Sequence, residues 1–256
     1  MTSEPAVAGR SLRLALGMLT AVPVPAVLRV TPGVATGALL LAPLAALPLG
    51  AVVGAILWGG AQTTVPALAV AVVALGVLAL GTRALHLDGL SDVADGLTAS
   101  YDRERSLAVM KSGTAGPAGV VAIVLVLGAQ AAALATFVGD VRSAVVAGAA
   151  VCASRAALWI TCATGVPPAR PDGLGSTFTG RVPGWWTLLG WAGLAAAATL
   201  VHPWRGPLAV GLAALVVILL VGRAVRRFGG VTGDVYGAAI ELALLTLLVA
   251  LAGAWT

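Results

Sequence analysis

TVPALAVAVVALGVLALGT, residues 64–82, contains no charged side chain and is long enough, as a helix, to cross a lipid bilayer. The hydrocarbon core of a bilayer is about 30 Å thick, and a helix needs about 20 apolar residues to span it. The whole chain has the same character, because 59% of its 256 residues are hydrophobic and only 10% are charged. Soluble domains have roughly 25% charged residues. The sequence therefore predicts an integral membrane protein whose surroundings are the lipid bilayer.

Other apolar runs of similar length follow along the chain. With 64–82 they predict an all-α fold, a polytopic helical membrane bundle with about seven transmembrane helices. There is no internal repeat and no separate hydrophilic segment, so residues 1–256 are expected to form a single membrane-embedded domain. Glycine-rich stretches such as GAVVGAILWGG, residues 50–60, should allow close helix contacts. The other predicted spans are 34–59, 113–137, 142–164, 184–201, 206–222 and 234–255.

Residues 1–30 do not continue this pattern. Pro23 and Pro25 interrupt the apolar stretch there, and no small-residue cleavage site precedes a polar chain, as a cleavable signal would require. We expect this segment to lie in the membrane interface or to be re-entrant. The sequence alone leaves open whether residues 14–28 cross the membrane.

Positive charge is distributed unevenly between the predicted connections. The formal net charge is +5, but the basic residues are not clustered and interleaved with aromatic residues, which argues against nucleic acid as a partner. Only Arg142 and Arg205 fall on one predicted side of the membrane. Because basic residues are retained in the cytoplasm, the long connections 83–112, 165–183 and 223–233 are expected to face the cytoplasm and to carry the active site.

The segment LHLDGLSDVADG, residues 85–96, begins three positions after the end of the first quoted run and contains three of the ten acidic residues. On a helix, Asp88, Asp92 and Asp95 fall within an arc of roughly 60° along about 10 Å of axis. Mg²⁺ binds carboxylate oxygens together with substrate phosphates, so this acidic face predicts a Mg²⁺ site. The alternative is a solvated acidic helix that is neutralised by the basic residues Arg103, Arg105 and Lys111.

A second polar group lies in GGVTGDVYGAAIEL, residues 229–242. Asp234 is a candidate for completing the metal shell, and Glu241 lies about 10 Å deeper on the same helix face. An acid at that depth costs about 2.5–3.5 kcal/mol on insertion scales, so it should be paired or functional. Arg155 is expected at a similar depth. A structural ion pair between Arg155 and Glu241 would place their two helices side by side, and a shared contact with substrate is the alternative.

Two further residues are candidates for chemistry. His86 precedes the aspartates, and it either accepts a proton, binds metal or simply caps the acidic helix. Arg170 lies in PPARPDGLGSTFTG, residues 167–180. Its guanidinium suits a phosphate, although turns alone also explain this composition.

These blocks together resemble the cobalamin synthase family, the adenosylcobinamide-GDP ribazoletransferases. The resemblance is carried by LHLDGLSDVADG, by RERSLAVMK at 103–111, by SRAALW at 154–159, by ARPDGLGSTFTG at 169–180 and by GGVTGDVYGAAIEL. It implies a Mg²⁺-dependent transferase of the bacterial cytoplasmic membrane. The expected reaction joins α-ribazole, or its 5′-phosphate, to adenosylcobinamide-GDP with release of GMP, the last assembly step of cobalamin biosynthesis.

The resemblance and the residue chemistry together define the expected site. The sequence does not decide whether the protein forms a homo-oligomer. We expect Asp95 or His86 to take the proton of the attacking hydroxyl. The expected metal ligands are Asp88, Asp92, Asp95 and Asp234, and the expected substrate contacts are Arg103, Arg105, Lys111, Arg155, Arg170 and Glu241.

Three other functions fit parts of the pattern. A CDP-alcohol phosphotransferase also opens its acidic motif with Asp-Gly, but Asp88 and Gly89 are followed by Leu90 and Ser91 rather than by Ala-Arg. A membrane prenyltransferase needs a second acidic block, which GDVYGAAIE matches poorly. A cation transporter is the non-enzymatic alternative, although transport sites usually lie near the midplane on discontinuous helices.

Overall fold

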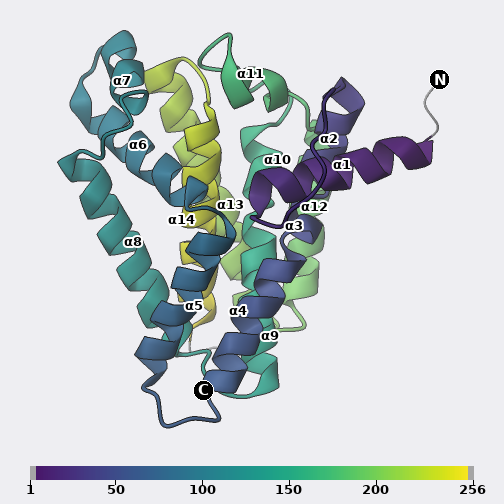
Figure 1. Ribbon diagram of the computed structural model, residues 1–256, viewed down its shortest axis with the longest axis vertical. Helices are drawn as coiled ribbons and strands as arrows, with labels where there is room; N and C mark the ends of the chain where they lie inside the picture. Colours follow the sequence, from purple (N-terminus) through teal and green to yellow (C-terminus); the bar gives the residue numbers. More distant parts are fainter. Residues whose placement is uncertain (1–3, 253–256) are drawn as a thin grey trace.

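The computed structural model describes residues 4–252, with side chains from residue 7 onward, and the regular secondary structure of this part of the chain is entirely helical. Only two isolated β-bridges occur within it, Ala163 with Val182 and Pro168 with Val231. The predicted all-α fold is therefore confirmed (Figure 1). The helices are α1 Glu4–Leu19, α2 Pro32–Leu40, α3 Ala42–Ala45, α4 Leu47–Gly60, α5 Ala67–Gly81, α6 Leu85–Ala99, α7 Arg103–Met110, α8 Pro117–Ala135, α9 Val141–Ser154, α10 Ala157–Thr161, α11 Gly173–Phe178, α12 Gly184–Ala198, α13 Arg205–Phe228 and α14 Gly233–Leu251.

The multi-pass membrane architecture follows from the length and hydropathy of these helices. Within residues 4–252, four segments are long and apolar enough to cross a membrane: α8, α9 continued through α10, α13 and α14. The pair α5 and α6 passes the same criterion when taken together, although the two helices are bent by 91°. The remaining predicted runs contain the shorter helices α4 and α12, of 14 and 15 residues. Within residues 4–252 every predicted run thus contains helix, and four to five spans qualify by length and composition; residues 253–255 of the predicted run 234–255 lie outside the described residues.

The predicted continuous span 34–59 is wrong, because the structure divides it into α2, α3 and α4. Leu41 and Ala46 separate these helices, and both have ψ close to 0°. Pro43 and Pro48 stand in the first turn of α3 and of α4. A proline lacks the N–H for the helical hydrogen bond, and its ring clashes with the carbonyl four residues earlier. A new helix therefore begins near each of the two prolines.

The predicted connection 83–112 contains the expected helix of the three aspartates as α6, and a second helix, α7. Arg83 and Ala84 end α5 with φ angles of 56° and 55°, a left-handed conformation that costs roughly 1–2 kcal/mol for each residue other than glycine. Neighbouring segments hold this break: Arg83 Nη2 donates to Gly17 O at 2.7 Å, and Ala21 N donates to Gly81 O at 2.6 Å. The chain leaves the break as α6, the helix with the three aspartates. Similarly, α13 continues to Phe228, which shortens the predicted connection 223–233.

Helix α14 is the centre of the bundle and packs against α6, α8, α9, α10 and α13. The contact with α6 is close because glycines lie at the crossing. A Cβ atom added to Gly89 would lie 2.6 Å from Asp234 O, and one added to Gly237 would lie 2.9 Å from His86 Cα. Helices α4 and α9 also meet closely, with Gly50 and Gly148 opposed, as their small residues predict. Backbone-to-backbone packing of α6 on α14 places the first acidic block beside the second.

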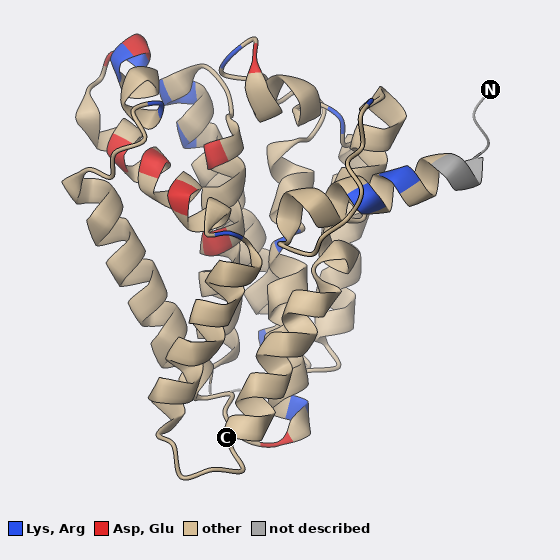
Figure 2. Cartoon of the chain, viewed as in Figure 1, with Lys and Arg blue, Asp and Glu red and all other residues tan. Residues whose placement is uncertain are grey.

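Charged residues gather mainly at one end of the bundle. Figure 2 shows Asp and Glu along α6 and α14 and around α7 and α11, with Lys and Arg at the same end and on α1. At the far end, Asp140 caps α9 through Ser143 N at 2.8 Å, and Arg142 donates to Leu200 O and Val201 O. The end that carries α6, α7 and α11 is therefore the polar end of the molecule.

Candidate active site

The aspartates of α6 lie on one helix face but in different environments. Asp88 is exposed, Asp92 is half-buried and Asp95 is buried. Asp234 stands in the first turn of α14 across the close contact at Gly89, where Thr232 Oγ1 donates to its Oδ2 at 3.0 Å. The charge of Asp92 interacts with those of Asp234, Asp88 and Asp95, and with that of Arg170. The carboxylates of two sequence blocks thus form one acidic site.

Asp95 has a structural role within this group. Its two carboxylate oxygens accept hydrogen bonds from Gly116 N at 2.7 Å and Gly119 N at 2.9 Å, at the start of α8. A carboxylate at a helix N-terminus satisfies N–H groups that have no partner within the helix. Asp95 is only 6% exposed. The structure therefore does not support the predicted proton-transfer role of Asp95, since both oxygens are held by backbone donors away from solvent.

Replacing Asp95 by asparagine is expected to lower the free energy of unfolding by about 1–3 kcal/mol, because the amide nitrogen is a donor and cannot accept the hydrogen bond of the backbone N–H that it faces. Thermal unfolding in detergent, together with hydrogen exchange at Gly116 and Gly119, measures this effect. Unchanged stability with a complete loss of turnover would instead assign Asp95 to the chemistry.

A polar pocket of about 200 Å³ opens next to Asp234. It lies between the start of α14 and the connection that carries α11, and the backbone joins these two segments: Ala169 N donates to Val231 O at 2.9 Å, and Val231 N donates to Pro167 O at 3.0 Å. Glycines permit this approach, since a Cβ on Gly175 would lie 2.8 Å from Val231 O. The pocket is lined by Arg170, Asp172, Gly173, Leu174, Gly175, Val231, Thr232, Gly233 and Asp234.

The basic side chains that were predicted to contact substrate differ in their hydrogen-bond partners and in their exposure. Arg103 donates from Nε to Phe228 O and from Nη2 to Ala169 O, both at 2.7 Å, so it ties α7 to the end of α13 and to the connection that carries α11. Arg170 lines the pocket and is anchored by a 2.6 Å bond from Nη2 to Leu107 O. Lys111 lies 3.8 Å from Asp172, and both side chains are exposed. Arg105 is exposed on α7. Arg103 is thus a structural link, and Arg170 is the arginine of this set that lines the pocket.

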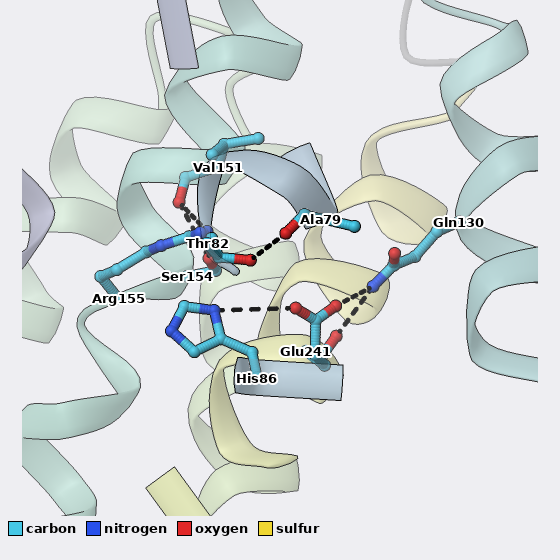
Figure 3. Close-up of polar contacts among 8 residues, drawn as sticks. All are labelled: Ala79, Thr82, His86, Gln130, Val151, Ser154, Arg155 and Glu241. Atoms are coloured by element: carbon cyan, nitrogen blue, oxygen red, sulfur yellow. Dashed lines mark hydrogen bonds and ion pairs between the residues drawn. The ribbon is translucent and has the colours of Figure 1, made fainter. Parts of the chain in front are cut away.

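His86, Gln130, Arg155 and Glu241 form a buried polar cluster between α6, α8, α9 and α14 (Figure 3). Gln130 Nε2 donates to Glu241 Oε2 at 3.0 Å, and His86 Nδ1 lies 3.8 Å from Glu241 Oε1. Arg155 is 0% exposed and donates from Nη1 to Val151 O and Ser154 Oγ. The predicted direct ion pair of Arg155 with Glu241 is therefore wrong, because Glu241 Oε2 accepts from Gln130 and Glu241 Oε1 faces His86. The packing of α9 against α14, which that pair was expected to produce, is present.

The sequence profile described as Cobalamin-5-phosphate synthase matches residues 11–252. The chain belongs to the cobalamin-5-phosphate synthase family. An "Adenosylcobinamide-GDP ribazoletransferase" of Nocardioides sp. (strain ATCC BAA-499 / JS614) is 54% identical over 93% of this chain and 96% of its own length. Proteins of the same name are 35% identical in Frankia casuarinae, over 93% of this chain and 92% of the relative, and 38% identical in Pseudomonas paraeruginosa, over 95% and 98%. No solved structure matches the chain.

The acidic site of this cobalamin-5-phosphate synthase family member has the donor chemistry of a Mg²⁺ site but not a complete set of ligands. Within residues 4–252, no three His, Cys, Asp or Glu side chains lie close enough to hold one ion. Mg²⁺ usually takes one or two carboxylates, with substrate phosphates and water as the other ligands. Asp88, Asp92 and Asp234 fit this requirement, because they are neighbouring carboxylates at the polar end whose mutual repulsion a cation would relieve.

Several residues of the site were not singled out from the sequence. Arg227 donates to Leu97 O at 3.3 Å and lies over the Tyr101 ring, 4.8 Å from its centroid, so it joins α13 to the end of α6. Thr232 orients Asp234, and Gln130 holds Glu241. Gln130 had a visible signal, since it is an amide inside an apolar run. The partners of Arg227 and Thr232 depend on contacts between segments.

Proposed function

We propose that this chain is an adenosylcobinamide-GDP ribazoletransferase. A hydroxyl of α-ribazole, or of its 5′-phosphate, forms a new bond to the phosphorus that is attached to cobinamide. The bond from this phosphorus to the oxygen of GMP breaks, and GMP leaves. The name of the relatives, which align with 93% or more of the chain, supports this reaction.

The observation that carries the proposal is the close crossing of α6 and α14 at Gly89. It brings Asp88 and Asp92 beside Asp234, and it places this acidic site next to the pocket that Arg170 lines. A nucleotide-linked diphosphate needs both kinds of group, since arginine binds phosphate oxygens directly and carboxylates bind phosphate through a metal ion.

Among Asp88, Asp92 and Asp234 we expect one or two carboxylates to hold Mg²⁺ together with the substrate phosphates. When bound, the ion would neutralise negative charge on the diphosphate and on the leaving phosphate. Arg170 contributes a phosphate contact, because its guanidinium has five N–H groups and the bond to Leu107 O anchors it at the pocket wall. Lys111 and Arg105, exposed at the same end, attract the anionic substrates.

Asp92 is the residue that we propose as acceptor of the hydroxyl proton. Asp95 is bonded to backbone N–H groups, and His86 is buried against Glu241. Asp92 is half-buried, and neither of its carboxylate oxygens accepts a hydrogen bond from the backbone of the described residues as those of Asp95 do. In this proposal the buried polar cluster of His86, Gln130, Arg155 and Glu241 holds α6 in position on α14 rather than contacting substrate.

The polar end of the bundle is proposed to face the cytoplasm of a bacterial cell. Most basic residues lie at that end and on α1, and basic residues are retained on the cytoplasmic side of the membrane. In this orientation both proposed substrates enter the site from the cytoplasm.

Purified protein with Mg²⁺, adenosylcobinamide-GDP and α-ribazole is expected to release GMP and to form a cobalamin, and chelation of the metal is expected to stop both. Inverted membrane vesicles should turn over added substrate, and right-side-out vesicles should not. CDP-diacylglycerol and prenyl diphosphates serve as competing substrates. Turnover of either one without GMP release from adenosylcobinamide-GDP would replace the proposed reaction by that of a CDP-alcohol phosphotransferase or a prenyltransferase.

A further inference from the structure

Three arginines surround a second pocket, far along the chain from the acidic site. Arg10 and Arg13 of α1 and Arg29 of the following segment line a surface hollow of about 360 Å³, together with Ala26, Val27 and Leu28. Figure 2 shows the basic residues of α1 on the opposite side of the bundle from the acidic residues of α6. The hollow is therefore separate from the pocket at Arg170.

The positive charge of this arginine pocket is not compensated by the protein side chains that the structure describes. Arg10 Nη2 donates to the main-chain oxygen of Arg29, which closes the segment onto α1, and Arg13 Nε donates weakly to Gly9 O at 3.4 Å. Neither of the two ion pairs among the described residues involves these arginines. None of the described residues that line this hollow beside the three arginines is acidic, so an anion bound there would be stabilised by the three guanidinium groups.

The surroundings of the pocket indicate a membrane surface rather than bulk water. Helix α1 lies across the bundle helices (Figure 1), and its Ser11, Ala15 and Leu19 are buried against α2 and α3. Beside the arginines, Leu28 is 93% exposed and Leu12 is 41% exposed. A helix in the interface places basic side chains at the phosphates and apolar side chains at the acyl chains.

We propose that Arg10, Arg13 and Arg29 bind the phosphate headgroup of an anionic phospholipid. Guanidinium groups donate in parallel to phosphate oxygens, and the exposed Leu28 enters the acyl region next to them. A bound lipid holds α1 and the segment 20–31 against the bundle, where α1 supports the break between α5 and α6 through Gly17 O and the segment supports it through Ala21 N.

The test compares two variants of equal charge. R13Q/R29Q removes two arginines of the pocket and leaves the bond from Arg10 to the Arg29 main chain. R223Q/R226Q removes two exposed arginines from the end of α13, at the same end of the molecule. Native mass spectrometry of protein in a neutral detergent, with equal amounts of phosphatidylglycerol and phosphatidylcholine added, measures the lipid that each protein retains.

Wild type and R223Q/R226Q are expected to retain phosphatidylglycerol in preference to phosphatidylcholine, and R13Q/R29Q is expected to lose about tenfold or more of this preference. Circular dichroism and the thermal midpoint check that R13Q/R29Q is folded. An equal loss in both variants overturns the proposal, because net charge alone would then explain binding. Displacement of the lipid by inorganic phosphate also overturns it, since the pocket would then take a free anion. The readout is lipid binding, so it is independent of the proposed transferase activity.

Discussion

Replacement of Asp92 by asparagine is expected to lower GMP release by about 100-fold or more, a loss in the range that positioned acid–base groups contribute, while the protein still inserts and folds. Asparagine preserves the shape of the side chain but removes its charge. Asp92 is half-buried and interacts with the charges of Asp234, Asp88 and Asp95, so it is both a proposed Mg²⁺ ligand and the proposed proton acceptor.

Turnover by D92N should be measured over a range of Mg²⁺ concentrations in the detergent-solubilised enzyme. The matched control is Glu104→Gln, which removes one exposed acid from α7 at the same end of the bundle and should leave GMP release close to the wild-type rate. The thermal midpoint of D92N should equal or exceed that of wild type, because one of several repelling charges is lost. Near-normal GMP release by D92N would remove Asp92 from the mechanism.

Replacement of Gly89 by alanine is expected to produce a second large loss of GMP release. This variant keeps every carboxylate of the site but changes the distance between them. The added Cβ would lie 2.6 Å from Asp234 O and 3.0 Å from Asp234 Cα. These are backbone atoms, so α6 must move away from α14. We expect a destabilisation of about 1–3 kcal/mol, in spite of a gain of about 1 kcal/mol in helix propensity. GMP release should also fall, since the shift separates Asp88 and Asp92 from Asp234.

Gly128→Ala is the matched control for this variant. Gly128 lies within α8, and a Cβ atom there would meet nothing within 4 Å. It should be neutral or slightly stabilising because alanine is the better helix former. The measurements are the thermal midpoint in detergent and the rate of GMP release. A Gly89→Ala protein with wild-type values of both would show that the α6–α14 contact does not position the site.

Much of the candidate site could be predicted from local sequence. The spacing of Asp88, Asp92 and Asp95 places them on one helix face, and the glycine at position 89 indicates a close backbone approach, which the structure has at Asp234. The different roles of the three aspartates on that face could not be predicted from the sequence. Asp95 differs from Asp92 because its partners, Gly116 and Gly119, lie 21 and 24 residues away and start another helix. The spacing of carboxylates along one helix carries no information about those donors.

The sequence by itself determined that the chain is a helical membrane protein, because hydropathy accumulates over each run and needs no knowledge of neighbouring segments. Tertiary structure decided where the helices break and which charges meet. The 91° bend at Arg83 and Ala84 depends on bonds to Gly17 and from Ala21, and His86 takes the place beside Glu241 that Arg155 was expected to fill. A buried polar group pairs with whichever partner the packing brings within reach, and periodicity along one chain segment cannot specify that partner.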